Sequence, residues 1–322
     1  MRLELLYLFG LEQKIGLIVG LLLFLPTAYY FNRIKSHISF FTRLLSFAVL
    51  FVIMALMIHF GAQVERPFFY IAAASILNPL AIGLIFTLMV AHEIIGALVL
   101  LLTRSNTVSS KKTLTHFSII TIVYLVNVAL AYLKENRLID WDIVYISPFV
   151  LITLSALLGI WLYKYREVQY GYLFTFSPFG AFFYAAMAIC CFTTMAHLQS
   201  TGNDPGLENF RDFILYGHLG YGAIFVIYII ANFIQPLKDN MKVYKVLYAP
   251  ISMPFFTYRI AGLIAFVALT LKSNWEVPRN QGISAYYNGL GDLHLANQEP
   301  LLAECYFEEA ARYGYNNHKS NF

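Results

Sequence analysis

The residues with the clearest chemical potential are His92 and Glu93, which adjoin each other in VAHEIIG (90–96) within a long apolar stretch. An ionised carboxylate at the centre of a bilayer costs about 2.5–3.5 kcal/mol on membrane-insertion scales. Glu93 is therefore expected to be protonated, or paired with a polar group facing the interior of a helical bundle. A proton relay, a substrate contact or a metal or haem ligand would suit such a catalytic pair. The structural alternative is a polar clamp between helices, with Asn127 and Asn232 as partners.

Three further histidines raise a second possibility. His59 closes one apolar run, His197 closes another, and His218 lies near the start of the next. Neutral imidazoles bind transition metals, and two at matched depth would hold a haem iron. The sequence thus suggests a metal site of His59, His197 and His218 at one membrane face, with His197 and His218 as the cofactor-binding pair for haem. No His-x-x-His or Glu-x-x-His spacing supports this site, and the alternative places the three rings at the lipid–water boundary.

The polar loop between His197 and His218 adds one candidate residue. QSTGNDPGLENFRD (199–212) contains Asp204, which would act near the histidines as a carboxylate ligand or a general base. The run Asn203-Asp204-Pro205-Gly206 is also a strong turn signal. A turn would explain these residues without any chemistry.

The elements that hold these residues are expected to be membrane helices. Of 322 residues, 59% are hydrophobic and 12% are charged, and mean hydropathy is +0.63. Soluble domains carry about 25% charged residues, whereas charge-free runs of roughly twenty residues can cross a bilayer as helices. The sequence predicts an all-α, polytopic bundle of about eight transmembrane helices, near 14–31, 44–64, 79–103, 113–133, 143–163, 173–197, 213–236 and 251–271. Residues 1–13 would form an interfacial helix, and residues 67–78 would be re-entrant or lengthen the third span.

Basic residues in the predicted loops indicate the orientation, because cytoplasmic loops are enriched in Lys and Arg. The odd-numbered loops contain Arg33, Lys35, Arg43, Arg104, Lys111, Lys112, Lys164, Arg166, Lys238, Lys242 and Lys245, whereas the even-numbered loops contain Arg66, Lys134, Arg137 and Arg211. This asymmetry predicts that both termini lie outside the cytoplasm. The membrane is expected to be a bacterial inner membrane. Arg259 is expected one turn inside the cytoplasmic face, with its guanidinium extended to water.

The composition changes after residue 272, where a linker (273–283) is expected to lead into a polar, helix-forming tail. Residues 284–317 have Tyr287, Leu290-Gly291, Ala303, Phe307 and Ala310 at the offsets of one 34-residue repeat. Small Gly291 and Ala303 would let two antiparallel helices approach, and Phe307 would fill the space between them. The segment resembles a tetratricopeptide (TPR) repeat, although His294 and Tyr315 depart from the pattern. HKSNF (318–322) is similar to the start of a second repeat, so the repeat domain is expected to continue.

These features support three functional hypotheses. The TPR resemblance implies protein partners, and hence a membrane platform that presents the repeats on the outer, periplasmic face for envelope assembly or secretion. The histidines suggest instead a metal- or haem-dependent enzyme or redox protein, and Glu93 suggests a proton-coupled transporter subunit. No Walker loop or dinucleotide turn occurs, and the basic residues lie in short loops, so neither nucleotide nor nucleic acid is expected as a partner. Cys190, Cys191 and Cys305 are expected to form no disulfide framework.

Overall fold

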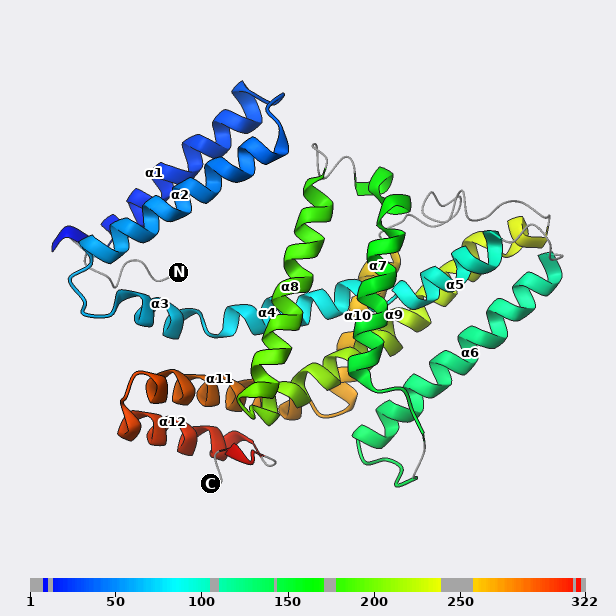
Figure 1. Ribbon diagram of the computed structural model, residues 1–322. Coiled ribbons are helices and arrows are strands. Elements are labelled where there is room, and N and C mark those ends of the chain that lie inside the picture. Colours follow the sequence, from blue (N-terminus) through cyan, green and yellow to red (C-terminus); the bar gives the residue numbers. More distant parts are fainter. Residues whose placement is uncertain are drawn as a thin grey trace.

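The computed structural model describes residues 8–10, 14–104, 110–141, 144–170, 178–238, 257–314 and 317–319. Every regular element in these ranges is a helix (Figure 1). The α-helices are α1 (Ile15–Tyr29), α2 (Phe40–Gly61), α3 (Pro67–Ser75), α4 (Leu77–Val90), α5 (Glu93–Arg104), α6 (Ser110–Glu135), α7 (Pro148–Tyr170), α8 (Phe179–Ser200), α9 (Asp204–Lys238), α10 (Thr257–Lys272), α11 (Glu276–Ala296) and α12 (Pro300–Tyr313). The all-α prediction is therefore confirmed for the described chain.

Six helical stretches within these ranges are long and apolar enough to cross a membrane. They are Ile15–Ile34, Phe40–Gly61, Pro67–Leu101, Thr115–Glu135, Phe179–Ser200 and Asp204–Asn232. The apolar part of α7 is shorter, at Pro148–Tyr163, and α10 reaches the required length only together with α11, from which it is bent by 90°. The chain is thus a multi-pass membrane protein with about six candidate spans in the described residues, or seven if α10 and α11 count as one, so the expected number of eight is not confirmed.

Several boundaries differ from those expected from the sequence. Residues 67–78 lengthen the third span, because α3, α4 and most of α5 form the single apolar stretch Pro67–Leu101. The seventh span starts at Asp204, nine residues before the expected position, since polar residues of the supposed loop are already helical. Most of the expected interfacial helix, and residues 173–177 and 251–256 of two expected spans, lie outside the described residues.

Helix α9 is the centre of the bundle and packs against α4, α6, α7, α8, α10 and α11. The side chains of Ile214, Leu215 and Phe225 on α9 are fully buried. Gly220 lets α10 approach closely, because a Cβ there would lie 2.9 Å from the backbone nitrogen of Phe266. This contact holds the middle of α10 against α9.

Helices α1 and α2 form a hairpin that lies apart from the other helices in Figure 1. Its two helices meet through aromatic side chains, among them Phe24 and Phe51 with ring centroids 4.8 Å apart. Phe40 of α2 contacts Phe182 of α8 at 5.3 Å, which joins this hairpin to the bundle. Most of its large apolar side chains are exposed, as expected for helices surrounded by lipid.

Helices α11 and α12 form a second, antiparallel hairpin below the bundle (Figure 1). Gly291 faces the ring of Phe307, and a Cβ at Gly291 would lie 2.5 Å from that ring. Residues 276–283, most of the expected linker, are instead the first two turns of α11. The hairpin is fastened to the bundle, because Asn203 and Asn209 of the α8–α9 region donate hydrogen bonds to the Ala285 and Pro278 carbonyls.

Candidate functional site

A break between α4 and α5 positions the first candidate residues. Helix α4 ends at Val90, and Ala91 and His92 form a turn before α5 begins at Glu93. The side chains of His92 and Glu93 are 0% and 1% exposed. Non-helical backbone at membrane depth is tolerated where it is buried in protein. The break therefore turns an imidazole and a carboxyl group into the interior of the bundle, as the sequence led us to expect for Glu93.

The imidazole of His92 meets the first turn of α10. Its Nε2 lies 3.1 Å from the Tyr258 hydroxyl and 3.5 Å from Nη2 of Arg259. Because a guanidinium can only donate hydrogen bonds, we assign Nε2 as the acceptor and Nδ1 as the protonated nitrogen. The nearer carboxyl oxygen of Glu93, Oε1, lies 3.7 Å from the same Nε2, which is beyond hydrogen-bond distance.

Arg259 is held at this site by contacts with α4 and with its own helix. Its Nη1 donates a hydrogen bond of 2.9 Å to the carbonyl of Met89, in the last turn of α4. Its guanidinium also lies 5.4 Å from the ring centroid of Tyr258, which is a cation–π contact. Arg259 is partly buried, and the end of α4 supplies it with an acceptor that single-span reasoning cannot place.

Helices α7 and α8 close the other side of Glu93. Gly159 of α7 lies against Glu93, whose Cγ would be 3.4 Å from a Cβ at that position. The hydroxyl of Tyr184 on α8 occupies the space beside Gly159 and donates 2.8 Å to the Ala156 carbonyl. A carboxyl group and a phenol thus come close together in the buried interior of the bundle, beside the Ala156 carbonyl.

His218 of α9 also contacts α7, as Glu93 does. Its Nε2 lies 2.8 Å from Oγ of Ser155, and its Nδ1 donates 2.7 Å to the Ile214 carbonyl. In the neutral ring, Nε2 then accepts from the Ser155 hydroxyl. His218 is fully buried, contrary to its expected place at the water boundary. The reason is the early start of α9, which puts His218 about 21 Å along the helix from Asp204 at 1.5 Å per residue.

The three histidines of the expected metal site lie in different surroundings. His59 is exposed at the end of α2, between the rings of Phe60 and Phe68. His197 is exposed in the last turn of α8, whereas His218 is in the core. The described ranges contain no group of three or more His, Cys, Asp or Glu side chains that could hold a metal ion. The structure therefore does not bring His59, His197 and His218 together as one ligand set.

Asp204 lies at the N-terminus of α9, away from the His92–Glu93 region. The turn itself is Thr201–Gly202, with Gly202 at a φ of +65°, and Asn203 caps the helix by accepting from the amide of Gly206 at 3.3 Å. The predicted turn at Asn203–Gly206 is thus a helix start. An Asn cap followed by Pro in the first turn is typical of helix N-termini, so this signal was present in the sequence.

Sequence reasoning missed a second polar site, a cavity of about 630 Å³ at the end of the bundle beside the α11–α12 hairpin. Asp212 of α9 is buried there, and Arg211 pairs with Glu135 of α6 at 3.2 Å. The hydroxyl of Tyr216 donates 3.3 Å to Asn136. Other residues that line the cavity come from the first turns of α11, so the site could be anticipated only by recognising that three connections share one end of the bundle.

Comparison with known proteins adds no relative: no family model, no curated protein and no solved structure matches this chain. The site must therefore be interpreted from its own chemistry. We use the name central cluster for His92, Glu93, Tyr184, Tyr258 and Arg259. The central cluster joins an acid, a base and a fixed cation inside a membrane bundle, which is a set of groups suited to binding and passing protons.

Proposed function

We propose that this protein is a proton-conducting subunit of a membrane transport system, with Glu93 and His92 of the central cluster as the proton carriers. The observation that carries the proposal is the convergence of His92, Glu93, Tyr258 and Arg259 at a helix break inside the bundle. Ionisable groups buried in membrane helices are costly, and they commonly mark proton or substrate pathways.

Charge balance explains why these groups would act together. Arg259 keeps its positive charge because a guanidinium does not lose its proton in proteins. With Glu93 ionised and His92 neutral, the cluster carries no net charge, and proton uptake by Glu93 would leave the charge of Arg259 uncompensated. The acceptor Nε2 of His92, 3.7 Å from Oε1 of Glu93, is close enough for a small side-chain movement to allow proton transfer between them.

Proton flux into liposomes tests this function. Vesicles containing the purified chain and a trapped pH-sensitive dye are energised with a potassium gradient and valinomycin. We expect wild-type vesicles to take up protons faster than protein-free vesicles, Glu93→Gln to reduce uptake to the protein-free rate, and Glu93→Asp to retain part of it. Glu309→Gln, on exposed α12, is the matched control and should conduct like wild type. Wild-type uptake at the protein-free rate, or unimpaired uptake by Glu93→Gln, would overturn the proposal.

A second candidate function concerns the α11–α12 hairpin. We propose that it is the base of a TPR domain on the outer, periplasmic face, to which protein partners bind during envelope assembly or secretion. Helix α11 faces the bundle, whereas α12 leaves Leu301 78% exposed and Leu302 and Cys305 also exposed. In TPR arrays each helix pair packs on the next, because a lone repeat cannot bury its apolar face. The uncovered face of α12 is where further repeats or a partner would bind. A haem or metal function is not proposed, since the histidines lie apart.

Photo-crosslinking tests this surface. A benzophenone amino acid placed at position 301 should form covalent adducts with protein in native membranes. The same probe at position 22, where exposed Leu22 lies on the α1–α2 hairpin, should form adducts with lipid alone. Equal yields of protein adducts from the two positions would argue against a dedicated partner surface on α12.

A further inference from the structure

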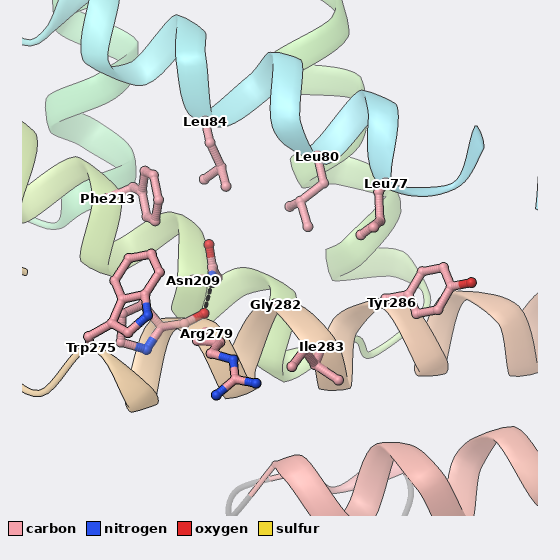
Figure 2. Close-up of a pocket in the computed structure, with 11 residues that line it drawn as sticks. Leu77, Leu80, Leu84, Asn209, Phe213, Trp275, Arg279, Gly282, Ile283 and Tyr286 are labelled. Carbon is pink, nitrogen blue, oxygen red and sulfur yellow. Dashed lines mark hydrogen bonds between the residues drawn. The ribbon is translucent and has the colours of Figure 1, made fainter. Parts of the chain in front are cut away.

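A mainly apolar cavity lies between the bundle and part of α11. It has a volume of about 270 Å³ and lies where α4, α9 and α11 meet (Figure 2). Leu77, Leu80 and Leu84 line it from α4, and Asn209 and Phe213 line it from α9. The opposite wall is the first half of α11, where Gly282 leaves space because it has no side chain.

Asn209 places an unsatisfied polar atom in this cavity. The side chain is 3% exposed, and its Nδ2 donates 2.6 Å to the Pro278 carbonyl. That bond fixes the amide orientation, because a carbonyl oxygen can only accept. Oδ1 then has no hydrogen-bond partner among the described residues. Figure 2 shows Oδ1 directed away from α11, toward α4 and between Leu84 and Phe213.

The missing partner of Oδ1 must be a hydrogen-bond donor. A buried acceptor left unsatisfied destabilises the protein, because the acceptor has lost its hydrogen bonds to water. The other lining groups of this cavity are largely aliphatic or aromatic, so the ligand that completes the site has an apolar body and a single donor group.

The cavity is continuous with the apolar surface of the bundle. It shares Leu77, Leu80 and Tyr286 with a second cavity of about 580 Å³ between α3–α4, the end of α8 and α11. Leu77 is itself exposed, as are Ile82 and Ile85 on the same helix. In a multi-pass membrane protein such surfaces face lipid, so an acyl chain can enter the groove from the bilayer.

The charge of the lining indicates a neutral ligand. Arg279 is the one charged residue among those that line the cavity of about 270 Å³. Figure 2 shows its guanidinium directed away from α4 and from Asn209. A carboxylate or phosphate inside the cavity would therefore lose its hydration without gaining a cation, which is strongly unfavourable.

We propose that the cavity beside Asn209 binds a neutral long-chain alcohol from the membrane. Its hydroxyl group donates a hydrogen bond to Oδ1 of Asn209, and its chain lies along Leu77, Leu80 and Leu84 beneath α4. The lipid would fill the space between the bundle and the hairpin. This inference does not depend on the proton-conducting role of the central cluster.

Quenching of Trp275, which lines the cavity, tests the proposal. The probe is 9,10-dibromo-octadecanol, added to the full chain in detergent, because bromine quenches a nearby indole. We expect saturable quenching that is lost in Trp275→Phe. The methyl ether of the probe, which has no donor, should bind about tenfold more weakly, since about 1.4 kcal/mol for one hydrogen bond corresponds to a tenfold change in Kd. The corresponding fatty carboxylate should bind more weakly still.

Two variants test separately the hydrogen-bond acceptor, Oδ1 of Asn209, and the cavity volume beside Gly282. Asn209→Leu should remove the preference for the alcohol over its methyl ether. Gly282→Leu should abolish quenching by filling the groove, because a Cβ at Gly282 has only Nδ2 of Asn209 nearby, at 3.5 Å. Ile189→Ala, on the exposed face of α8, is the control and should bind like wild type. Equal affinity for alcohol and ether in the wild-type chain, preferential binding of the carboxylate, or unchanged quenching in a folded Gly282→Leu variant would overturn the proposal.

Discussion

At position 159, the absence of a side chain allows three helices to meet around one carboxyl group. Gly159 of α7 faces both Glu93 of α5 and the hydroxyl of Tyr184 of α8. The Tyr184 hydroxyl is fixed there by its hydrogen bond to the Ala156 carbonyl. The small size of Gly159 is therefore what matters, because any larger residue would push the tyrosine away from its acceptor and disturb the surroundings of Glu93.

Replacing Gly159 should therefore destabilise the bundle in a way that Tyr184 controls. A Cβ at position 159 would overlap the Tyr184 hydroxyl, and its next neighbour is Cζ of that ring at 3.1 Å. Overpacking of this kind costs about 1–3 kcal/mol, so Gly159→Ala should lower the thermal unfolding midpoint in detergent. Tyr184→Phe should lower it less, since one hydrogen bond is lost, at about 0.5–1.5 kcal/mol. The double variant should be more stable than the sum of the two effects predicts. Simple additivity would show that the two side chains do not compete for the same space.

The partners of His92 show the limit of prediction from residue spacing. Glu93 and His92 could be identified from the sequence, because ionisable residues in an apolar run are costly in lipid. Tyr258 and Arg259 lie 166 and 167 positions from His92 in the chain, and no local pattern links them to it. Their proximity follows from the packing of α10 on α9, which depends on side-chain volumes and not on hydropathy.

At the scale of helices, hydropathy predicted where most helices lie but not how they begin or bend. The gaps between charged residues predict the spans, and they place the start of the seventh span at residue 213. Asp204, Glu208 and Arg211 are instead helical, because a polar end of a helix can project beyond the apolar layer. The same reasoning missed the bend of 90° between α10 and α11. That bend brings α11 back across the end of the bundle, where it packs on α9.

The close contact of α9 with α10 can be tested at Gly220. A Cβ at Gly220 would lie 2.9 Å from a backbone atom of α10, so Gly220→Ala should force the two helices apart and lower the unfolding midpoint. The matched control is Gly282→Ala, also in a helix, where the nearest atom would be 3.5 Å away. The control should be unchanged or slightly stabilised, because Ala favours a helix over Gly by about 1 kcal/mol. Equal midpoints for the two variants would exclude close α9–α10 packing as a source of stability.

At the scale of the whole molecule, connections from separate parts of the chain gather at one end of the bundle. The α6–α7 connection supplies Asn136, the α9 N-terminal region supplies Asp212, and the α10–α11 bend supplies Asn274, all around one polar cavity. Arg66, before α3, also reaches the α11–α12 loop and hydrogen-bonds to Asn297. The sequence assigned these same connections and the C-terminal tail to one side of the membrane. The structure places these connections together at one end of the bundle.

Labelling of a natural cysteine determines which side this end occupies. Cys305 is exposed on α12, whereas Cys191 is buried in α8. Because Lys and Arg are concentrated in the loops of the opposite end, we expect Cys305 to lie outside the cytoplasm. A membrane-impermeant maleimide should therefore label the chain in cells with a permeable outer envelope and an intact inner membrane. Cys305→Ser should remove that label, which identifies the reactive site. If labelling of Cys305 requires disruption of the inner membrane, the hairpin is cytoplasmic, and partners of its α12 face must then be sought in the cytoplasm.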